Sequence, residues 1–205
     1  TLTMVDGVLT GRPLPPALID EIVDRTDGVP LFIEELTKTL ITADLAENRG
    51  SAATVLGSHI PSTLHDSLMA RLDRLGSAKE VAQIGAVIGR EFSRDLIGAL
   101  SPLDSIELDL ALTTLTASGL AFERGPQPAT SFQFKHALLQ DAAYASLLRS
   151  KRQDLHWRIG QALEANYPEH ARVEPEVVAH HYTQAGRVLE AAGYWAAAAH
   201  RSLDR

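Results

Sequence analysis

With 205 residues and a formal net charge of −7 at pH 7, the chain is long enough for one large or two to three small domains, and it has no general attraction for nucleic acid or anionic lipid. Hydrophobic residues make up 45% and charged residues 22%, which excludes a disordered chain and indicates a folded, soluble one. The absence of cysteine excludes disulfides, thiolate metal sites and thiol catalysis, so a reducing cytoplasm is the expected location.

The apolar runs and the N-terminal sequence argue against a membrane protein. Charge or glycine interrupts every apolar run well short of the ~20 residues that span a bilayer. No basic segment followed by an apolar one opens the chain, as it would in a signal peptide. We expect a cytoplasmic protein that does not enter a membrane, and the abrupt start at Thr1 suggests a segment of something longer.

Residues 1–76 are predicted to form a helical subdomain with a loop at 46–60, where turn-forming residues show no period. Gly28 ends the first helix and Pro30 can open the second, so the two make a tight helix–turn–helix corner. A third helix follows Pro61. The apolar stripes at helical spacing are Leu14, Leu18 and Ile22, then Phe32, Ile33, Leu36 and Leu40, then Leu64, Leu68, Leu72 and Leu75.

Residues 77–149 are predicted to form a winged-helix domain, because three helices are followed by a β-hairpin. The hairpin strands are 120–123 and 131–134, and Gly125 to Pro128 form the turn between them. The apolar helix positions are Val81, Ile84 and Ile88, then Leu96, Ile97 and Leu100, then Leu108, Leu112 and Leu115.

Further helices are expected near 136–149, 151–166, 174–185 and 187–202. The last pair is joined at Gly186, and its facing positions are rich in alanine (Ala192, Ala196, Ala199). Residues 150–205 are therefore predicted to be a helical segment and the first TPR-like hairpin. Such a unit cannot bury its apolar face alone, so we expect further repeats and protein partners bound through them.

The sequence contains no phosphate-cradling GxxxxGK[ST] loop, so no catalytic residue is assigned and this segment alone should not hydrolyse ATP. Glu176 and His180 share a helix face and His181 follows, which could begin a metal site if a third ligand came from elsewhere. The alternative is that His181 and Tyr182 pack against the next helix while His180 faces solvent. No metal site is predicted.

The third helix of the winged-helix segment argues against DNA binding. It begins with Asp104, Glu107 and Asp109, and no Lys or Arg follows before Arg124. Phosphates would be repelled by three carboxylates at the end that would face a groove. The basic cluster of Arg149, Lys151 and Arg152 is better explained as a solvated helix start or a partner face.

Four stretches carry a resemblance to the STAND class of signal-transduction ATPases, and more narrowly to the ATPase region that follows the catalytic domain in many bacterial class III adenylate/guanylate cyclases. Together they extend over nearly the whole chain. They are Gly28-Val29-Pro30-Leu31-Phe32-Ile33-Glu34-Glu35-Leu36, Ile60 to Leu75, Phe134-Lys135-His136-Ala137 to Tyr144, and Ala179-His180-His181-Tyr182 to Trp195.

The resemblance implies that a helical lid and a winged helix close over ADP or ATP held by an upstream P-loop domain that this chain lacks. Pro30 of the Gly28-x-Pro30 corner would pack beside the base, and His136 would touch the phosphate of ADP; no nucleotide is expected in this segment alone. The usual Met-His-Asp of the class is Lys135-His136-Ala137 here. The alternative for His136 is a residue at a helix N-cap, hydrogen-bonded to backbone.

The function implied by the resemblance is a regulatory fragment attached to an adenylate/guanylate cyclase, itself without catalytic activity. Two alternatives remain open at this point. The same module could belong to a LuxR-type transcriptional regulator, or it could be a helical interaction scaffold that needs no nucleotide.

Overall fold

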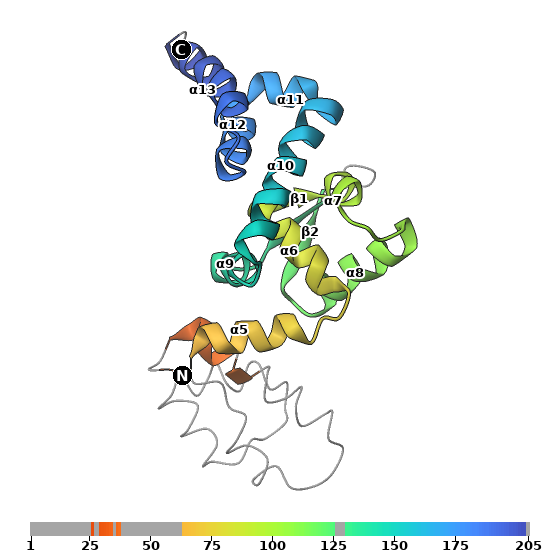
Figure 1. The fold of residues 1–205 in the computed structure, drawn as a ribbon. Coiled ribbons are helices and arrows are strands. Elements are labelled where there is room, and N and C mark those ends of the chain that lie inside the picture. The colour runs from red at the N-terminus through yellow and green to blue at the C-terminus, as the bar shows by residue number, and fades with distance from the viewer. Residues whose placement is uncertain (1–25, 27–28, 35, 38–62, 126–129, 204–205) are drawn as a thin grey trace, which may run out of the picture. The chain divides into compact units, whose positions relative to one another are not determined.

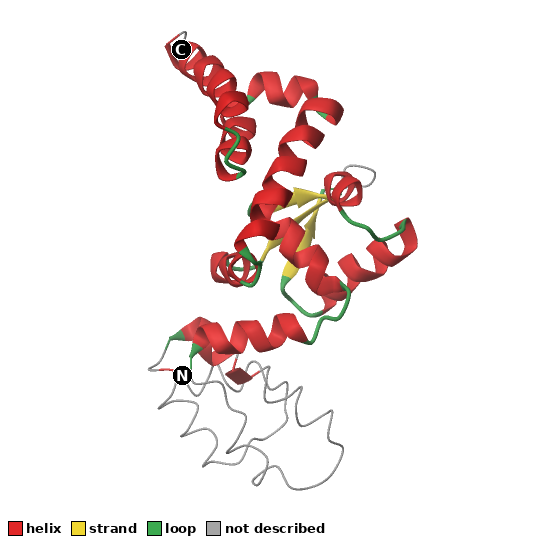
Figure 2. Cartoon of the chain, viewed as in Figure 1, coloured by secondary structure: helices red, strands yellow, loops and turns green. Residues whose placement is uncertain are grey.

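The computed structural model describes residues 26, 29–34, 36–37, 63–125 and 130–203, which are coloured in Figure 1. They belong to two compact units, Thr1–Arg74 and Leu75–Arg205, and each is described by itself. Most of the described residues are helical, and a small antiparallel sheet supplies the remaining regular structure (Figure 2). The predicted mainly-α class is confirmed. No helix in the described part of the chain is both long and apolar enough to cross a membrane.

In the first unit, a helix begins at Pro30, as predicted. Residues 30–34 and 36–37 are helical, and the N–H of Ile33 donates to the carbonyl of Val29 at 3.0 Å. Ile33 and Leu36 are fully buried, which agrees with the shared apolar face. The helix predicted around Leu14–Ile22, the Gly28 corner residue and the loop at 46–60 lie outside the described residues.

Helix α5 (Leu64–Asp73) is the predicted helix after Pro61. The Thr63 hydroxyl caps it by accepting from the Asp66 N–H at 3.1 Å, so the first turn has one orphan donor fewer. Leu68 and Leu72 are buried on one face, as their i,i+4 spacing requires.

The second unit begins with helices and short strands in alternation, and its sheet has the order β1-β3-β2 with both pairings antiparallel. The hairpin of β2 and β3 is the predicted one. Strand β1 was not predicted and adds a third strand to it. The elements are α6 (Ala78–Ile88), β1 (Glu91–Ser93), α7 (Arg94–Leu100), α8 (Ser105–Ala117), β2 (Ala121–Arg124) and β3 (Ser131–Phe134).

The sheet holds its place in the core through three phenylalanines. Phe92 of β1 stacks on Phe132 with ring centroids 6.0 Å apart and meets Phe134 at 5.3 Å. Gly85 of α6 lets the Phe92 ring approach the helix backbone, since a Cβ there would lie 2.8 Å from the ring. Glycine at this position therefore allows α6 to pack closely against an aromatic ring.

Helix α8 is defined at both ends by its sequence. The Asp104 carboxylate accepts from the N–H groups of Ile106 and Glu107, and the Glu107 side chain accepts from the Asp104 N–H, which completes a capping box. Gly119, at φ 69°, ends the helix in the left-handed region, which glycine adopts readily.

The remaining helices match the predicted ones except at one place. The structure has α9 (Ala137–Ala145), α10 (Arg149–Asn166), α11 (Pro168–Val173), α12 (Pro175–Gln184) and α13 (Val188–Leu203). The short α11 was not predicted, because its six residues carry only one buried side chain, Ala171. Helices α12 and α13 lie side by side, joined at Gly186 (Figure 1).

Candidate functional site

Pro30 lies at the exposed start of its helix in the first unit. Its neighbour Val29 is 45% exposed, so the corner presents apolar surface to its surroundings. Helix starts also carry N–H groups without partners inside the helix, and these favour anions. The geometry is compatible with contact to a nucleotide. Gly28, the other residue of the corner, lies outside the described residues.

His136 occupies the N-cap position of α9, directly after β3. Its backbone is extended (φ −137°, ψ 144°), its side chain is half-buried, and its side chain does not cap its own helix. Its carbonyl accepts from the Leu139 N–H at 3.0 Å. The imidazole is therefore placed beside a helix N-terminus by the chain path from strand to helix.

Pro30 and His136 belong to different compact units. Their joint contact with one nucleotide remains a prediction.

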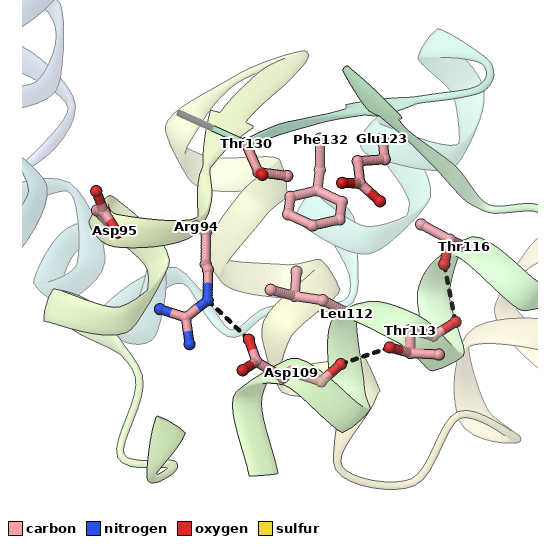
Figure 3. A pocket seen from close by; sticks show the side chains of 9 residues that line it. All are labelled: Arg94, Asp95, Asp109, Leu112, Thr113, Thr116, Glu123, Thr130 and Phe132. Atoms are coloured by element: carbon pink, nitrogen blue, oxygen red, sulfur yellow. Dashed lines mark hydrogen bonds and ion pairs between the residues drawn. The ribbon is translucent and has the colours of Figure 1, made fainter. Parts of the chain in front are cut away.

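A groove lies between α7, α8 and the sheet of the second unit, with a cavity volume of about 580 Å³ (Figure 3). Leu112 of α8 and Phe132 of β3 supply its apolar side chains, and polar side chains from all sides surround them. The Arg94 guanidinium donates to Asp109 at 2.7 Å and to the Ser105 hydroxyl at 2.8 Å. The hydrogen bond between Arg94 and Asp109 lowers the pKa of Asp109 and raises the pKa of Arg94.

Sequence reasoning missed this groove. From the sequence, Asp109 enters only as a negative charge that would repel phosphate. The partner, Arg94, comes fifteen residues earlier on another helix, and no periodic pattern signals a contact of that kind.

A buried polar chain joins α9, α10 and α12. The Nδ1 atoms of His156 and His181 lie 2.9 Å apart, and His156 Nε2 lies 3.1 Å from the Tyr144 hydroxyl. Both histidines are 2% exposed, and burial lowers the pKa of His156 to about 4 and that of His181 to about 3. The pair is neutral at pH 7, so one Nδ1 carries a proton and the other accepts it.

Of the two interpretations of this segment, a metal site or packing, the structure supports packing for His181 and Tyr182. Both are buried and His180 is exposed. His181 contacts His156 of α10, and Tyr182 contacts Trp157 of α10 and Tyr194 of the following helix, α13. In the described part of the chain, no group of three or more His, Asp or Glu side chains is arranged to hold a metal ion.

Glu164 connects α10 to α12 and α13. Its two oxygens accept at 2.6 Å from the hydroxyls of Tyr182 and Tyr194. Burial and the hydrogen bond to Glu164 raise the pKa of Tyr182, and the same causes raise that of Tyr194 to about 12. The Arg187 guanidinium lies 4.4 Å from the centre of the Trp157 ring on the same side of α10.

Comparison with known proteins identifies a relative. No protein-family model matches the chain. Over 194 residues, or 92% of the chain, it is 32% identical to an uncharacterized protein of Rhizobium meliloti (strain 1021). The chain spans about a fifth of the length of that relative (19%). The shared region therefore stands, in the relative, within a much longer polypeptide.

Proposed function

We propose that this chain is the regulatory part of a signal-transduction ATPase, in which a helical lid, a winged helix and TPR-like helical pairs respond to ADP or ATP held by an upstream P-loop domain. The output is a cyclase domain of the same polypeptide. The chain itself performs no catalysis, and the cytoplasm, where ATP is abundant, is its location.

The observation that carries the proposal is the position of His136. The element order α6–β1–α7–α8–β2–β3 is the order of a winged helix, and His136, two residues after the last strand, is the N-cap of α9. An imidazole at that point can donate to a phosphate oxygen, and the helix N-terminus behind it adds the positive end of a helix dipole. Both interactions favour a bound anion.

The switch follows from a difference between nucleotides. With ADP bound, His136 and Pro30 would hold the winged helix and the lid closed on the nucleotide. Exchange for ATP, which adds a third phosphate, would displace the phosphate that His136 contacts. A ligand shifts such an equilibrium only by its difference in affinity for the two states, so the contact to His136 must differ between them.

The test uses the full-length product of the natural gene. ADP release is measured with a fluorescent analogue for the wild type, for His136→Ala and for His200→Ala, a matched control at an exposed position of α13. Loss of one hydrogen bond to a charged group costs about 1.5–3 kcal/mol, so His136→Ala should release ADP roughly 10- to 100-fold faster. His200→Ala should behave as the wild type.

His136→Gln distinguishes a phosphate contact from a folding defect, because glutamine keeps a donor without the imidazole. It should retain part of the ADP affinity. If His136→Ala folds as the wild type does and holds ADP with unchanged affinity, the switch role of His136 is wrong.

A further inference from the structure

The outer side of α8 presents two large aliphatic side chains to solvent. Ile106 is 80% exposed and Leu110 is 66% exposed. They are four residues apart, so they lie next to each other on one face of the helix. Single exposed apolar residues are ordinary on protein surfaces, but an adjacent pair beside a groove is typical of an interaction site.

This pair continues into the groove of Figure 3. At 3.6 residues per turn, Asp109 and Thr113 of α8 lie between the exposed pair and the groove residue Leu112. Glu123 of β2 faces Leu112 from the sheet side of the groove. We call this continuous area the α8 surface: Ile106 and Leu110 outside, Asp109 and Thr113 at the edge, Leu112, Phe132 and Glu123 in the groove.

The charge of the α8 surface is negative. The groove brings together the carboxylates of Asp95, Asp109 and Glu123 and one cation, Arg94. Arg94 is occupied by Asp109 and Ser105. Among the described residues, no Lys or Arg forms an ion pair with Asp95 or Glu123. The groove therefore carries unneutralised negative charge beside an apolar patch, which attracts cations and repels phosphate.

We propose that the α8 surface binds a cationic amphipathic segment of a partner protein. Apolar side chains of that segment cover Ile106 and Leu110, and a Lys or Arg enters the groove beside Glu123. The methylene stem of such a residue packs along Leu112 and Phe132 while its charged end meets the carboxylates. The charge complementarity selects this occupant over a nucleic acid. The inference concerns a surface other than the nucleotide contact at His136 and does not depend on it.

The probe for this interface is a synthetic 15-residue amphipathic helix built only from Leu and Lys, with Leu at helical spacing. Its matched control carries Glu in place of every Lys. Binding to the isotope-labelled 205-residue chain is followed by amide chemical shifts, which locate the bound peptide. Shifts should concentrate in 94–117, 121–125 and 130–132 for the Lys peptide and be absent for the Glu peptide.

Two variants test the two parts of the surface, and each has a control. Leu110→Gln removes exposed apolar area from α8, and Leu189→Gln removes the same area from α13, where Leu189 is 88% exposed. Glu123→Gln removes a groove charge, and Glu176→Gln removes an exposed charge from α12. Leu110→Gln and Glu123→Gln should each weaken binding about tenfold, as central interface residues do, and the two controls should not.

Several results would overturn the inference. They are absence of binding, equal binding by the Glu peptide, equal losses in the Leu189→Gln control, or amide shifts at the α8 surface when a 20-base-pair DNA duplex is added to the chain without peptide. Self-association of the chain that Leu110→Gln abolishes would assign the surface to a second copy instead. All four variants sit at exposed positions, and unchanged amide spectra outside the substituted site would show that they fold.

Discussion

The contact between Gly160 and Tyr182 allows a sharp prediction about stability. A Cβ at residue 160 of α10 would lie 2.6 Å from Cε1 of the Tyr182 ring and 2.9 Å from two further ring atoms. The ring is 1% exposed and cannot easily move away. Its hydroxyl donates to Glu164 at 2.6 Å, and its centroid lies 5.5 Å from that of the Trp157 ring. Gly160→Ala must therefore displace a ring that is held at both ends.

The expected cost can be assembled from its parts. Overpacking costs about 1–3 kcal/mol, and loss of the partly exposed bond to Glu164 adds about 1 kcal/mol. Replacing glycine by alanine inside a helix returns about 1 kcal/mol. Gly160→Ala should thus lower the free energy of unfolding by about 1–3 kcal/mol.

Urea unfolding followed by tryptophan fluorescence measures this change. The chain has two tryptophans, and both report on this region: Trp157 contacts Tyr182, and Trp195 donates to Thr183 of α12. Gly193→Ala in α13 is the matched control, since nothing lies within 4 Å of its Cβ position. It should stabilise the protein by up to ~1 kcal/mol.

The Tyr182→Leu background tests whether the clash with the ring causes the loss of stability. If the ring causes the loss, Gly160→Ala should cost little once Tyr182 is replaced by Leu, and the double-mutant cycle should show strong coupling. The reasoning is refuted if Gly160→Ala is as stable as the wild type, or if its cost is the same in the Tyr182→Leu background.

Two predictions concern pH. The folded pKa of His156 is about 4 and its ordinary value is 6.5, so the stability that the neutral pair contributes is complete above pH 6.5 and is lost as pH falls toward 4. His181→Gln, which removes one titrating ring, should flatten the pH dependence of urea unfolding between pH 6.5 and 5; an unchanged slope would contradict this. The folded pKa of Tyr194 is about 12 against an ordinary 10.0, so its contribution is complete below pH 10 and is lost as pH rises toward 12. Tyr194→Phe should remove that alkaline loss and cost about 1 kcal/mol at pH 7, as measured by the same fluorescence assay.

The sequence predicted the helices with strong apolar periodicity and the β-hairpin, because those patterns are local. It failed for β1, where three residues with a single buried side chain, Phe92, are too few for an alternation to show. The place of β1 beside β3 depends on a pairing 42 residues away, Glu91 with Gln133, which no local signal encodes.

The candidate site was predictable only in part. The helix starts at Pro30 and after His136 follow from turn chemistry and from the resemblance, whereas the contact of these two residues with a nucleotide stays a prediction. The groove of Arg94 and Asp109 and the chain from Tyr144 through His156 were not predicted, because each is assembled from side chains on different helices. Such clusters depend on tertiary packing, and a sequence alone does not give packing.

Helix α10 has a mechanical consequence for the second unit. It has 18 residues and is therefore about 27 Å long. Near its start Arg152 lies 5.0 Å from the centre of the Tyr144 ring of α9, at its middle Arg158 donates to the Leu100 carbonyl at 2.6 Å, and near its end Glu164 accepts from α12 and α13. Helix α10 thus connects the sheet-bearing part of the unit with α12 and α13. A 10° tilt about Arg158 would move Glu164, six residues or about 9 Å further along the helix, by about 1.6 Å, so α10 is suited to pass a rotation of the sheet-bearing part on to the C-terminal helix pair.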